Sequence, residues 1–332
     1  QKGFVFHRED EKMMKTNKKC AVVGGGTMGR QIGLNAAIHG YTTTICETAP
    51  AVQEHLIKWE EEYLAGRIAK GKMTVEQVAD IKRRFSVTAD LNFALKDADI
   101  IIESITEDRE AKSKVLQQIS ELAAENAIIG TNSSYMVSSL FKDVVKNPER
   151  LVNLHFFAPA LVMKLVEIVK GDHVSTTTVE NAINFCRSVG KVPVLVRKEV
   201  DGFIVNNILS AIKEEAYRLV NADVCSVEDL DTAVKLGLGH PMGPFELDDL
   251  SGIDIRYHVL KRRLMETGVR SEGYDIIEKL YQEGRYGKKL GTVFTITCSL
   301  LAFNDILSIV FSFELYLIYF LKLMVVICGS EK

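Results

Sequence analysis

The stretch KKCAVVGGGTMG, residues 18–29, places a short apolar strand directly before a glycine-rich turn. Gly24 permits a tight turn, Gly26 lets the backbone approach a ligand, and Gly29 lets the following helix pack close to the strand. A helical pattern and a second apolar strand follow over residues 30–46. This order of elements predicts an α/β fold with a parallel sheet.

The start of the predicted helix, residues 30–39, has the chemistry of a dinucleotide site. Unpaired N–H groups at a helix N-terminus bind phosphate groups. The second strand, residues 41–46, leads into Glu47, whose carboxylate is placed to accept hydrogen bonds from the ribose of adenosine. An acid there repels a 2′-phosphate, so a Rossmann-type fold that binds NAD is predicted. A glycine turn in another α/β protein is the alternative.

Length and composition narrow the class of protein. The 332 residues are enough for two domains, and the net charge of −3 argues against broad binding to nucleic acid. The six cysteines are scattered without a CxxC pair. This usage predicts reduced thiols in the cytoplasm and neither a disulfide framework nor a metal site.

Further apolar runs extend the predicted sheet. Residues 98–105 and 127–134 are typical of parallel strands that are buried on both faces. The first run ends in Glu103, and Glu107 comes shortly after it, where ligands of such sheets bind at the carboxyl ends of strands. Residues 51–84 predict a pair of charged helices, which either form a solvated pair or an arm over a bound substrate.

The stretch LHFFAPALVMKLVEIV, residues 154–169, holds two ionisable groups in an apolar setting: His155 and Glu167. Burial of such groups is costly unless they pair or take part in chemistry. If the stretch forms an antiparallel hairpin, His155 is predicted to lie opposite Leu165, with Glu167 as a diagonal neighbour on the same face.

The hydrophobic period changes after Asp201. GFIVNNILSAIKEEAYRLV is helical in pattern, with one apolar face at positions 204, 208, 212, 216 and 219. Ser226 is predicted to cap the next helix. We therefore expect a Rossmann-type, mostly parallel sheet domain over residues 17–199 and an all-helical domain over residues 200–291.

The two ends of the chain differ from the rest. Residues 1–16 are expected to be a disordered extension. Residues 292–332 form an atypical apolar tail, and its longest charge-free run, residues 290–304, is 15 residues long. This run is shorter than the ~20 residues that span a bilayer. A shifted or unspliced reading frame is favoured over membrane association and over an extra buried helix or oligomer contact.

Four motifs occur together in this order: GGGTMG, HFFAPALVMKLVEIV, GFIVNN and GHPMGPFELDDLSG. With them the chain resembles the 3-hydroxyacyl-CoA dehydrogenases, most closely bacterial short-chain 3-hydroxybutyryl-CoA dehydrogenases, over about residues 17–291. The resemblance implies reversible, NAD-dependent oxidation of a (3S)-3-hydroxyacyl-CoA to a 3-oxoacyl-CoA. It also implies an NAD domain and a helical domain through which subunits form a homodimer.

The resemblance assigns catalytic roles to residues of these motifs. His155 matches the general base of the family and Glu167 matches its partner. An imidazole, with a reference pKa of ~6.5, is suited to accept a proton near neutral pH. Asn206 matches an asparagine that hydrogen-bonds near the reacting groups. Ser133 matches a serine that touches substrate and nicotinamide, with Ser134 as the alternative.

The implied cofactor site extends along the chain. Glu107 and Lys112 match residues on the nicotinamide side, and Lys289 of YGKKLG matches a lysine that reaches the cofactor. The full implied set is Gly24, Gly26, Thr27, Met28, Gly29, Glu47, Glu107, Lys112 and Lys289. Ala158 stands where the family usually has asparagine. Two rival functions remain at this point: a dehydrogenase of free hydroxy acids, and an NAD-binding protein of weak activity.

Overall fold

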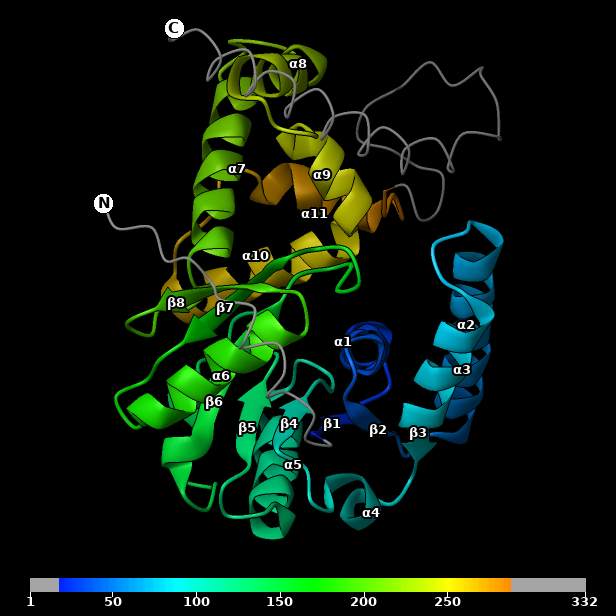
Figure 1. Cartoon of the computed structure of the whole chain (residues 1–332). Helices are drawn as coiled ribbons and strands as arrows, with labels where there is room; N and C mark the ends of the chain where they lie inside the picture. The colour runs from blue at the N-terminus through cyan, green and yellow to red at the C-terminus, as the bar shows by residue number, and fades with distance from the viewer. Residues whose placement is uncertain (1–17, 288–332) are drawn as a thin grey trace, which may run out of the picture. The chain divides into compact units, whose positions relative to one another are not determined.

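The computed structural model describes residues 18–287 (Figure 1). The chain divides into two compact units between residues 208 and 209. The predictions for residues 1–16 and 292–332 lie outside the described residues. No helix among the residues described is long and apolar enough to cross a membrane.

The first unit is built on one eight-stranded sheet with the order β3-β2-β1-β4-β5-β6-β7-β8. Its strands are β1 (Lys19–Val23), β2 (Thr42–Cys46), β3 (Phe85–Thr88), β4 (Ile100–Glu103), β5 (Ile128–Thr131), β6 (Leu151–Phe156), β7 (Leu165–Val169) and β8 (Val192–Val196). The β6–β7 pair is antiparallel and the other neighbouring pairs are parallel. The predicted Rossmann-type sheet is therefore confirmed.

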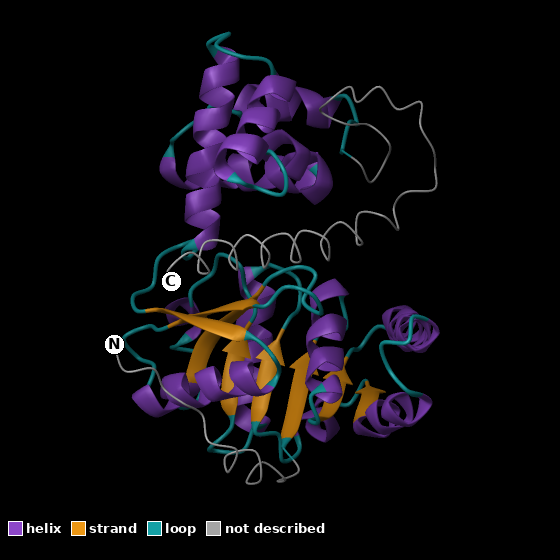
Figure 2. Ribbon diagram, turned by 45° about the horizontal axis from the view of Figure 1, so that its top comes forward, coloured by secondary structure: helices purple, strands orange, loops and turns teal. Residues whose placement is uncertain are grey.

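Helices cover both faces of this sheet (Figure 2). They are α1 (Thr27–Ile38), α2 (Pro50–Ala69), α3 (Val75–Arg84), α4 (Leu91–Leu95), α5 (Arg109–Leu122) and α6 (Thr176–Ser188), with short 3₁₀ helices η2 (Ser138–Phe141) and η3 (Pro148–Arg150). Side chains of a strand alternate between the faces. In β4, Ile100 and Ile102 belong to the core cluster of α1 and α6, whereas Ile101 belongs to that of α4 and α5. This double coverage explains the continuous apolar runs in the sequence.

The predicted register of the β6–β7 hairpin was wrong by two residues. His155 pairs directly with Glu167 and not with Leu165. Strand β6 ends at Phe156 and β7 begins at Leu165, so residues 157–164 form the loop between them. A shift by two residues keeps every side chain on its predicted face, so His155 and Glu167 still share one face.

The second unit is helical. Its elements are the continuation of α7 (Val205–Asn221), which begins in the first unit, and α8 (Val227–Leu238), α9 (Pro244–Ser251), α10 (Ile253–Thr267) and α11 (Tyr274–Gln282). Tyr217, Phe245 and Ile277 lie in its core. The Ser226 hydroxyl accepts the Asp229 N–H at 3.0 Å, which confirms the predicted cap.

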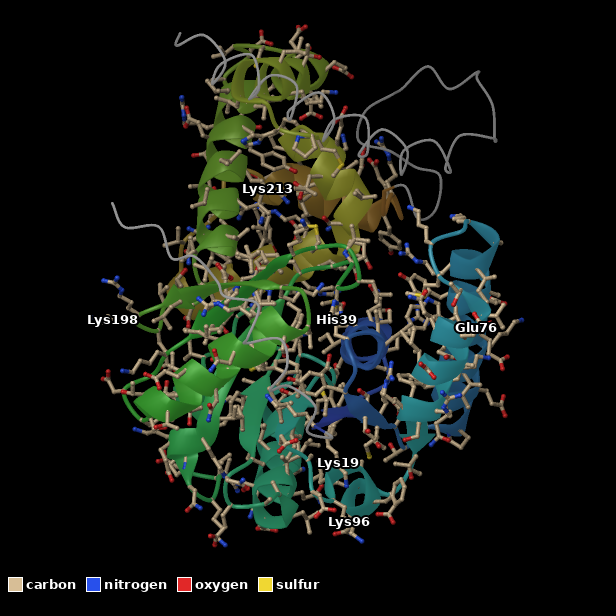
Figure 3. All side chains as sticks on the ribbon, viewed as in Figure 1. Lys19, His39, Glu76, Lys96, Lys198 and Lys213 are labelled. Atoms are coloured by element: carbon tan, nitrogen blue, oxygen red, sulfur yellow. The ribbon has the colours of Figure 1, made fainter. Side chains whose placement is uncertain are left out.

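The predicted apolar face of α7 was partly wrong. Ile208 is 57% exposed, whereas Tyr217 and Lys213 are buried. Lys213 is labelled on its helix in Figure 3. Both polar groups are tolerated because they donate hydrogen bonds to the two oxygens of Asp248 on α9. A sequence period cannot reveal this pairing, since it assigns Lys213 to the solvent side.

Candidate active site

The glycine-rich turn follows β1 and is most closely packed at Gly24 and Gly29. Gly24 has a φ of +107°, and a Cβ there would lie 2.5 Å from the Ser104 carbonyl oxygen. A Cβ at Gly29 would lie 1.9 Å from the Gly24 carbonyl oxygen. A Cβ at Gly26 would meet no atom within 4 Å, so this glycine faces open space.

The N-terminus of α1 has the features of an anion site. Gly26 is its N-cap, no side chain caps the free N–H groups, and the first turn carries no acid. Thr27 is exposed and Met28 is half-buried against the core. Free N–H groups beside open space at the start of a 12-residue helix fit a diphosphate.

Glu47 follows β2 and lies against the glycine turn. Its Oε2 accepts the Gly25 N–H at 2.8 Å, and its Oε1 accepts the Ala49 N–H at 2.9 Å. The carboxylate is therefore fixed beside the place where Gly26 opens to solvent. The role of Glu47 toward the adenosine ribose stays a prediction.

The His155–Glu167 pair joins β6 to β7. His155 Nδ1 lies 2.9 Å from Glu167 Oε2, and both residues are buried. Glu167 Oε1 accepts the N–H groups of Ile204 and Val205 at 3.1 and 3.0 Å, at the start of α7. An ionised Glu167 only accepts hydrogen bonds, so Nδ1 carries the proton and Nε2 is left as the basic nitrogen.

The charge on Glu167 is stabilised by these contacts. Burial by itself would raise the pKa of this carboxyl, but the hydrogen bonds from His155 and from the N–H groups of Val205 and Ile204 outweigh it and lower the pKa. Two aromatic rings flank the imidazole, with centroids 4.4 Å away at Phe157 and 5.4 Å away at Phe203. The imidazole is thus held between a charged partner and apolar walls.

A second polar cluster lies at the carboxyl ends of β4 and β5. Lys112 is 1% exposed, and its Nζ lies 2.7 Å from Glu103 Oε1 and 3.2 Å from Glu107 Oε2. The other oxygen of Glu107 accepts the Ser133 hydroxyl and the Ser134 N–H. The structure therefore brings Glu107, Lys112 and Ser133 together through direct contacts.

Glu103 is a member of this cluster to which sequence reasoning gave no role. It is fully buried, and it also accepts the Thr131 hydroxyl at 2.6 Å and the Ile105 N–H at 2.8 Å. The signal for it was present, because an acid ended an otherwise apolar strand. Its partner could not be identified, because Lys112 lies on α5 and the helical pattern does not show which of its lysines turns inward.

The Ser133 hydroxyl is engaged within the protein. It donates to Glu107 and accepts the Met136 N–H at 2.8 Å. Ser134 is half-buried, and its carbonyl oxygen accepts a hydrogen bond from Asn206 Nδ2 at 3.2 Å. Ser133 is thus placed to orient Glu107, and Ser134 is the more accessible of the two hydroxyls.

The loop between β6 and β7 is held by a lysine that the sequence did not single out. Lys191 is buried, and its ammonium donates to the carbonyl oxygens of Ala160 and Met163. Ala158 is exposed in the same loop. Lys289, the predicted cofactor lysine, lies outside the described residues.

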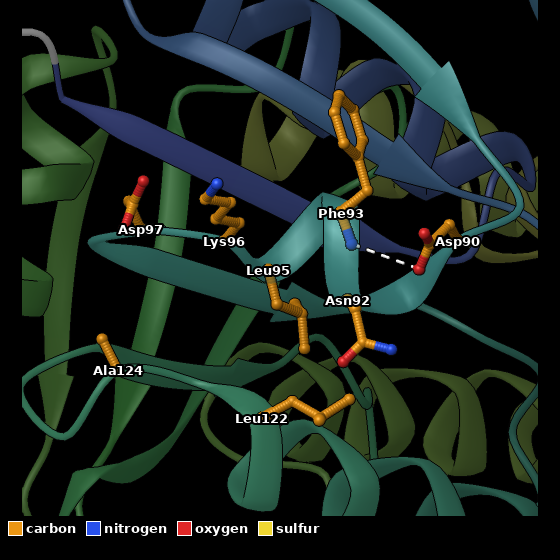
Figure 4. A pocket seen from close by; sticks show the side chains of 8 residues that line it. All are labelled: Asp90, Asn92, Phe93, Leu95, Lys96, Asp97, Leu122 and Ala124. Atoms are coloured by element: carbon orange, nitrogen blue, oxygen red, sulfur yellow. Dashed lines mark hydrogen bonds between the residues drawn. The ribbon is translucent and has the colours of Figure 1, made fainter.

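One surface pocket lies away from these groups (Figure 4). Its lining includes Lys96 and Asp97, which precede β4, and Ala124, which precedes β5. It is therefore at the amino edge of the sheet, whereas His155 and Glu107 are near the carboxyl ends of β6 and β4. Within residues 18–287, no group of three or more His, Cys, Asp or Glu side chains could hold a metal ion.

Comparison with known proteins identifies the family. Residues 19–200 match the model of the 3-hydroxyacyl-CoA dehydrogenase NAD-binding domain, and residues 202–296 match that of the C-terminal domain. The chain is 33% identical over 272 residues to the 3-hydroxybutyryl-CoA dehydrogenase of Clostridioides difficile, covering 82% of this chain and 96% of that protein. It is 33% identical over 285 residues to the mitochondrial hydroxyacyl-coenzyme A dehydrogenase of Sus scrofa, covering 83% and 90%.

A solved structure agrees with these matches. The (S)-3-hydroxybutyryl-CoA dehydrogenase of Ralstonia eutropha is similar with a TM-score of 0.78 and 30% sequence identity, covering 84% of this chain and 100% of that one. The matched NAD-binding domain makes NAD the cofactor. The glycine turn, the paired histidine and both matched domains show that this chain belongs to the 3-hydroxyacyl-CoA dehydrogenase family of NAD-dependent oxidoreductases.

Proposed function

We propose that this protein oxidises the 3-hydroxyl of a short-chain (3S)-3-hydroxyacyl-CoA, such as 3-hydroxybutyryl-CoA, reversibly and with NAD. The buried His155–Glu167 pair is the observation that carries the proposal, because it supplies an oriented base in a chain of this family. The names of the relatives from Clostridioides difficile and Ralstonia eutropha support the short-chain substrate.

In the proposed mechanism, His155 Nε2 removes the proton of the substrate hydroxyl. NAD, when bound, would supply the acceptor for the hydride of C3. Loss of the hydroxyl proton to His155 together with this hydride converts the alcohol to a ketone and leaves His155 as an imidazolium. Glu167 holds the tautomer through Nδ1 and stabilises the positive charge that forms. In the reverse direction the imidazolium returns the proton to the ketone oxygen.

The remaining site residues act around this pair. We propose that Asn206 and one of the two serines, Ser133 or Ser134, hydrogen-bond near the reacting groups. Ser133 also orients Glu107, which with Lys112 forms the nicotinamide side of the site. The diphosphate of the cofactor binds at the glycine turn, and Lys289 completes the cofactor site.

Reduction of acetoacetyl-CoA by NADH, followed at the nicotinamide absorbance, tests the proposal. Turnover of the thioester without turnover of free acetoacetate supports it. Turnover of the free acid alone would identify a dehydrogenase of free hydroxy acids. Binding of NADH without turnover of either compound would identify an NAD-binding protein of weak activity.

Replacement of Glu167 by glutamine is expected to lower kcat by about 10- to 100-fold, because it removes a charge-assisted hydrogen bond to the imidazolium. The effect on stability should depend on pH. The folded-state pKa of Glu167 is lowered from 4.5, so its stabilising contribution is present above that pH and is lost as the pH falls through the folded value. Melting temperatures should therefore differ most near neutral pH and converge as the pH falls below the lowered folded-state pKa of Glu167. A constant difference across this range would contradict the assignment.

Glu47 is proposed to select NAD over NADP through the adenosine ribose. Glu47→Ala should raise the Kd of NADH by about 10-fold and reduce discrimination against NADPH, because an acceptor of two ribose hydrogen bonds is lost. Glu47→Gln keeps an acceptor for the Gly25 N–H and removes only the charge. It should relax discrimination with a smaller loss of NADH affinity. Equal use of NADH and NADPH by the unmodified protein would contradict this placement.

The wider assignments are also proposals. We propose an NAD domain over residues 17–199 and a helical domain over residues 200–291 that carries substrate and dimer contacts. Leu236 and Met265 are exposed apolar side chains of the helical unit that could lie in a homodimer interface. Size-exclusion chromatography with light scattering measures the oligomeric state.

We also propose a cytoplasmic location, which the free cysteines among the described residues fit.

A further inference from the structure

Asn153 is a buried polar residue that the proposed mechanism does not use. It lies on β6 two residues before His155, so the two side chains point to the same face of the sheet. Leu151, on the same face, is apolar, and Asn153 is itself fully buried. An amide in such a place costs stability unless its donor and its acceptor are both hydrogen-bonded. The partners of this amide therefore indicate its role.

The amide of Asn153 bonds on both sides to the loop after β5, the strand beside β6 (Figure 1). Its Oδ1 accepts the Ser138 N–H at 2.7 Å, and its Nδ2 donates to the Met136 carbonyl oxygen at 2.9 Å. The Met136 N–H in turn donates to the Ser133 hydroxyl at 2.8 Å. Two side chains thus fix both backbone polar groups of Met136.

These bonds close a turn over residues 133–136, which carries both candidate serines. We call it the serine turn. The Ser134 N–H donates to Glu107, and the Ser134 carbonyl oxygen accepts a hydrogen bond from Asn206 Nδ2 at 3.2 Å. A displacement of the serine turn would therefore change its contacts with both Glu107 and Asn206, two residues of the proposed site.

A different side chain holds the loop just beyond the serine turn. Glu199 follows β8, and its Oε1 accepts the Ser138 hydroxyl at 3.1 Å and the Ser139 N–H at 3.0 Å. These contacts fix the start of η2 without help from Asn153. Loss of the Asn153 amide should therefore loosen the serine turn locally and leave η2 in place.

We propose that Asn153 is a positioning residue for the reaction. Its amide sets the place of Met136, and the serine turn then holds its two hydroxyls and its contact with Asn206 where the reacting groups need them. Asn153 acts only through the turn, because no part of its side chain is exposed to a ligand. The inference rests on the proposed function, which gives the serines and Asn206 their part in turnover.

Asn153→Leu removes both hydrogen bonds at similar volume. With NADH, kcat for acetoacetyl-CoA should fall by about 10-fold, the effect of one lost hydrogen bond on a barrier. The Kd of NADH should stay within about 2-fold, because the diphosphate is proposed to bind at the glycine turn. Asn35→Leu is the matched control: Asn35 on α1 is also buried, and its Nδ2 donates to the Val189 carbonyl oxygen at 3.0 Å. This variant should lose thermal stability to a similar extent and keep the parent kcat.

Asn153→Asp gives a readout that packing alone would not move, and its near-identical shape favours folding even where Asn153→Leu fails to fold. The carboxyl can still accept the Ser138 N–H, but only its protonated form donates to the Met136 carbonyl oxygen. Burial raises the pKa of a carboxyl, so protonation is expected within about pH 5–8. The kcat of Asn153→Asp relative to the parent protein should therefore recover as the pH falls through this range. Asn35→Asp should regain thermal stability in the same way, with kcat at the parent level throughout.

Hydrogen exchange of the backbone amides of residues 135–139 measures the hold on the turn without catalysis. Asn153→Leu should speed exchange there, and Asn35→Leu should not. Unchanged exchange in Asn153→Leu, faster exchange with parent kcat, or an equal loss of kcat in Asn35→Leu would each overturn the inference. If the parent protein reduces no thioester, the proposed function fails, and the exchange of Asn153→Leu alone decides whether the amide holds the serine turn.

Discussion

His155→Ala is expected to reduce turnover of acetoacetyl-CoA by about 10²- to 10⁴-fold, the range typical of a lost general acid–base group. The reason is that, within residues 18–287, no other basic side chain is hydrogen-bonded to Glu167, whose second oxygen accepts the N–H groups of Ile204 and Val205. The affinity for NADH, measured by nicotinamide fluorescence, should remain within about 2-fold of that of the parent protein. The reason is that the glycine turn follows β1, whereas His155 lies on β6.

Two further variants separate chemistry from folding. His155→Ala leaves a buried carboxylate without its partner, which costs about 1–3 kcal/mol of stability. His155→Gln keeps a donor for Glu167 but supplies no base, so it should fold better and be equally inactive. His55→Ala, at an exposed position on α2, is the control and should keep parent activity. A folded His155→Gln protein with near-parent turnover would exclude the proposed mechanism.

Local sequence patterns were sufficient to predict the features that depend on local chemistry. The strand, turn and helix around Gly24 and Gly29 were predictable because each glycine has a distinct steric role in that turn. Helix α1 nevertheless begins at Thr27, three residues before the predicted start, because the turn feeds directly into the helix. Apolar periodicity is a weak guide there, since glycine and threonine carry little hydrophobic signal.

Features that depend on partners from distant segments were less predictable. The hairpin register was misjudged because no turn motif fixed the length of the loop after Phe156. Lys112 and Lys213 are both buried beside a carboxylate on another element, and neither of these pairs was predicted from the sequence. A sequence shows that a lysine is present, but the fold decides whether a carboxylate compensates its burial.

Gly29→Ala is expected to raise the Kd of NADH by about 10- to 100-fold. A Cβ at this position would lie 1.9 Å from the Gly24 carbonyl oxygen, a backbone atom that cannot rotate away. Relief of the contact requires α1 to move from β1 or the turn to open, and overpacking of this kind costs about 1–3 kcal/mol. Either movement displaces the free N–H groups at the start of α1 that are proposed to bind the diphosphate. Fluorescence titration with NADH measures the loss.

The matched control for this prediction is Gly66→Ala within α2. A Cβ there meets no atom within 4 Å, so the substitution adds only helix propensity and should stabilise the protein by about 0.5–1 kcal/mol without changing the affinity for NADH. A lower melting temperature of Gly29→Ala together with parent affinity for NADH would show that the strain is absorbed by the core and not by the turn. That result would remove the link between close packing at Gly29 and cofactor binding. Loss of affinity at a retained melting temperature would place the strain in the turn itself, which is the outcome that the open space at Gly26 favours.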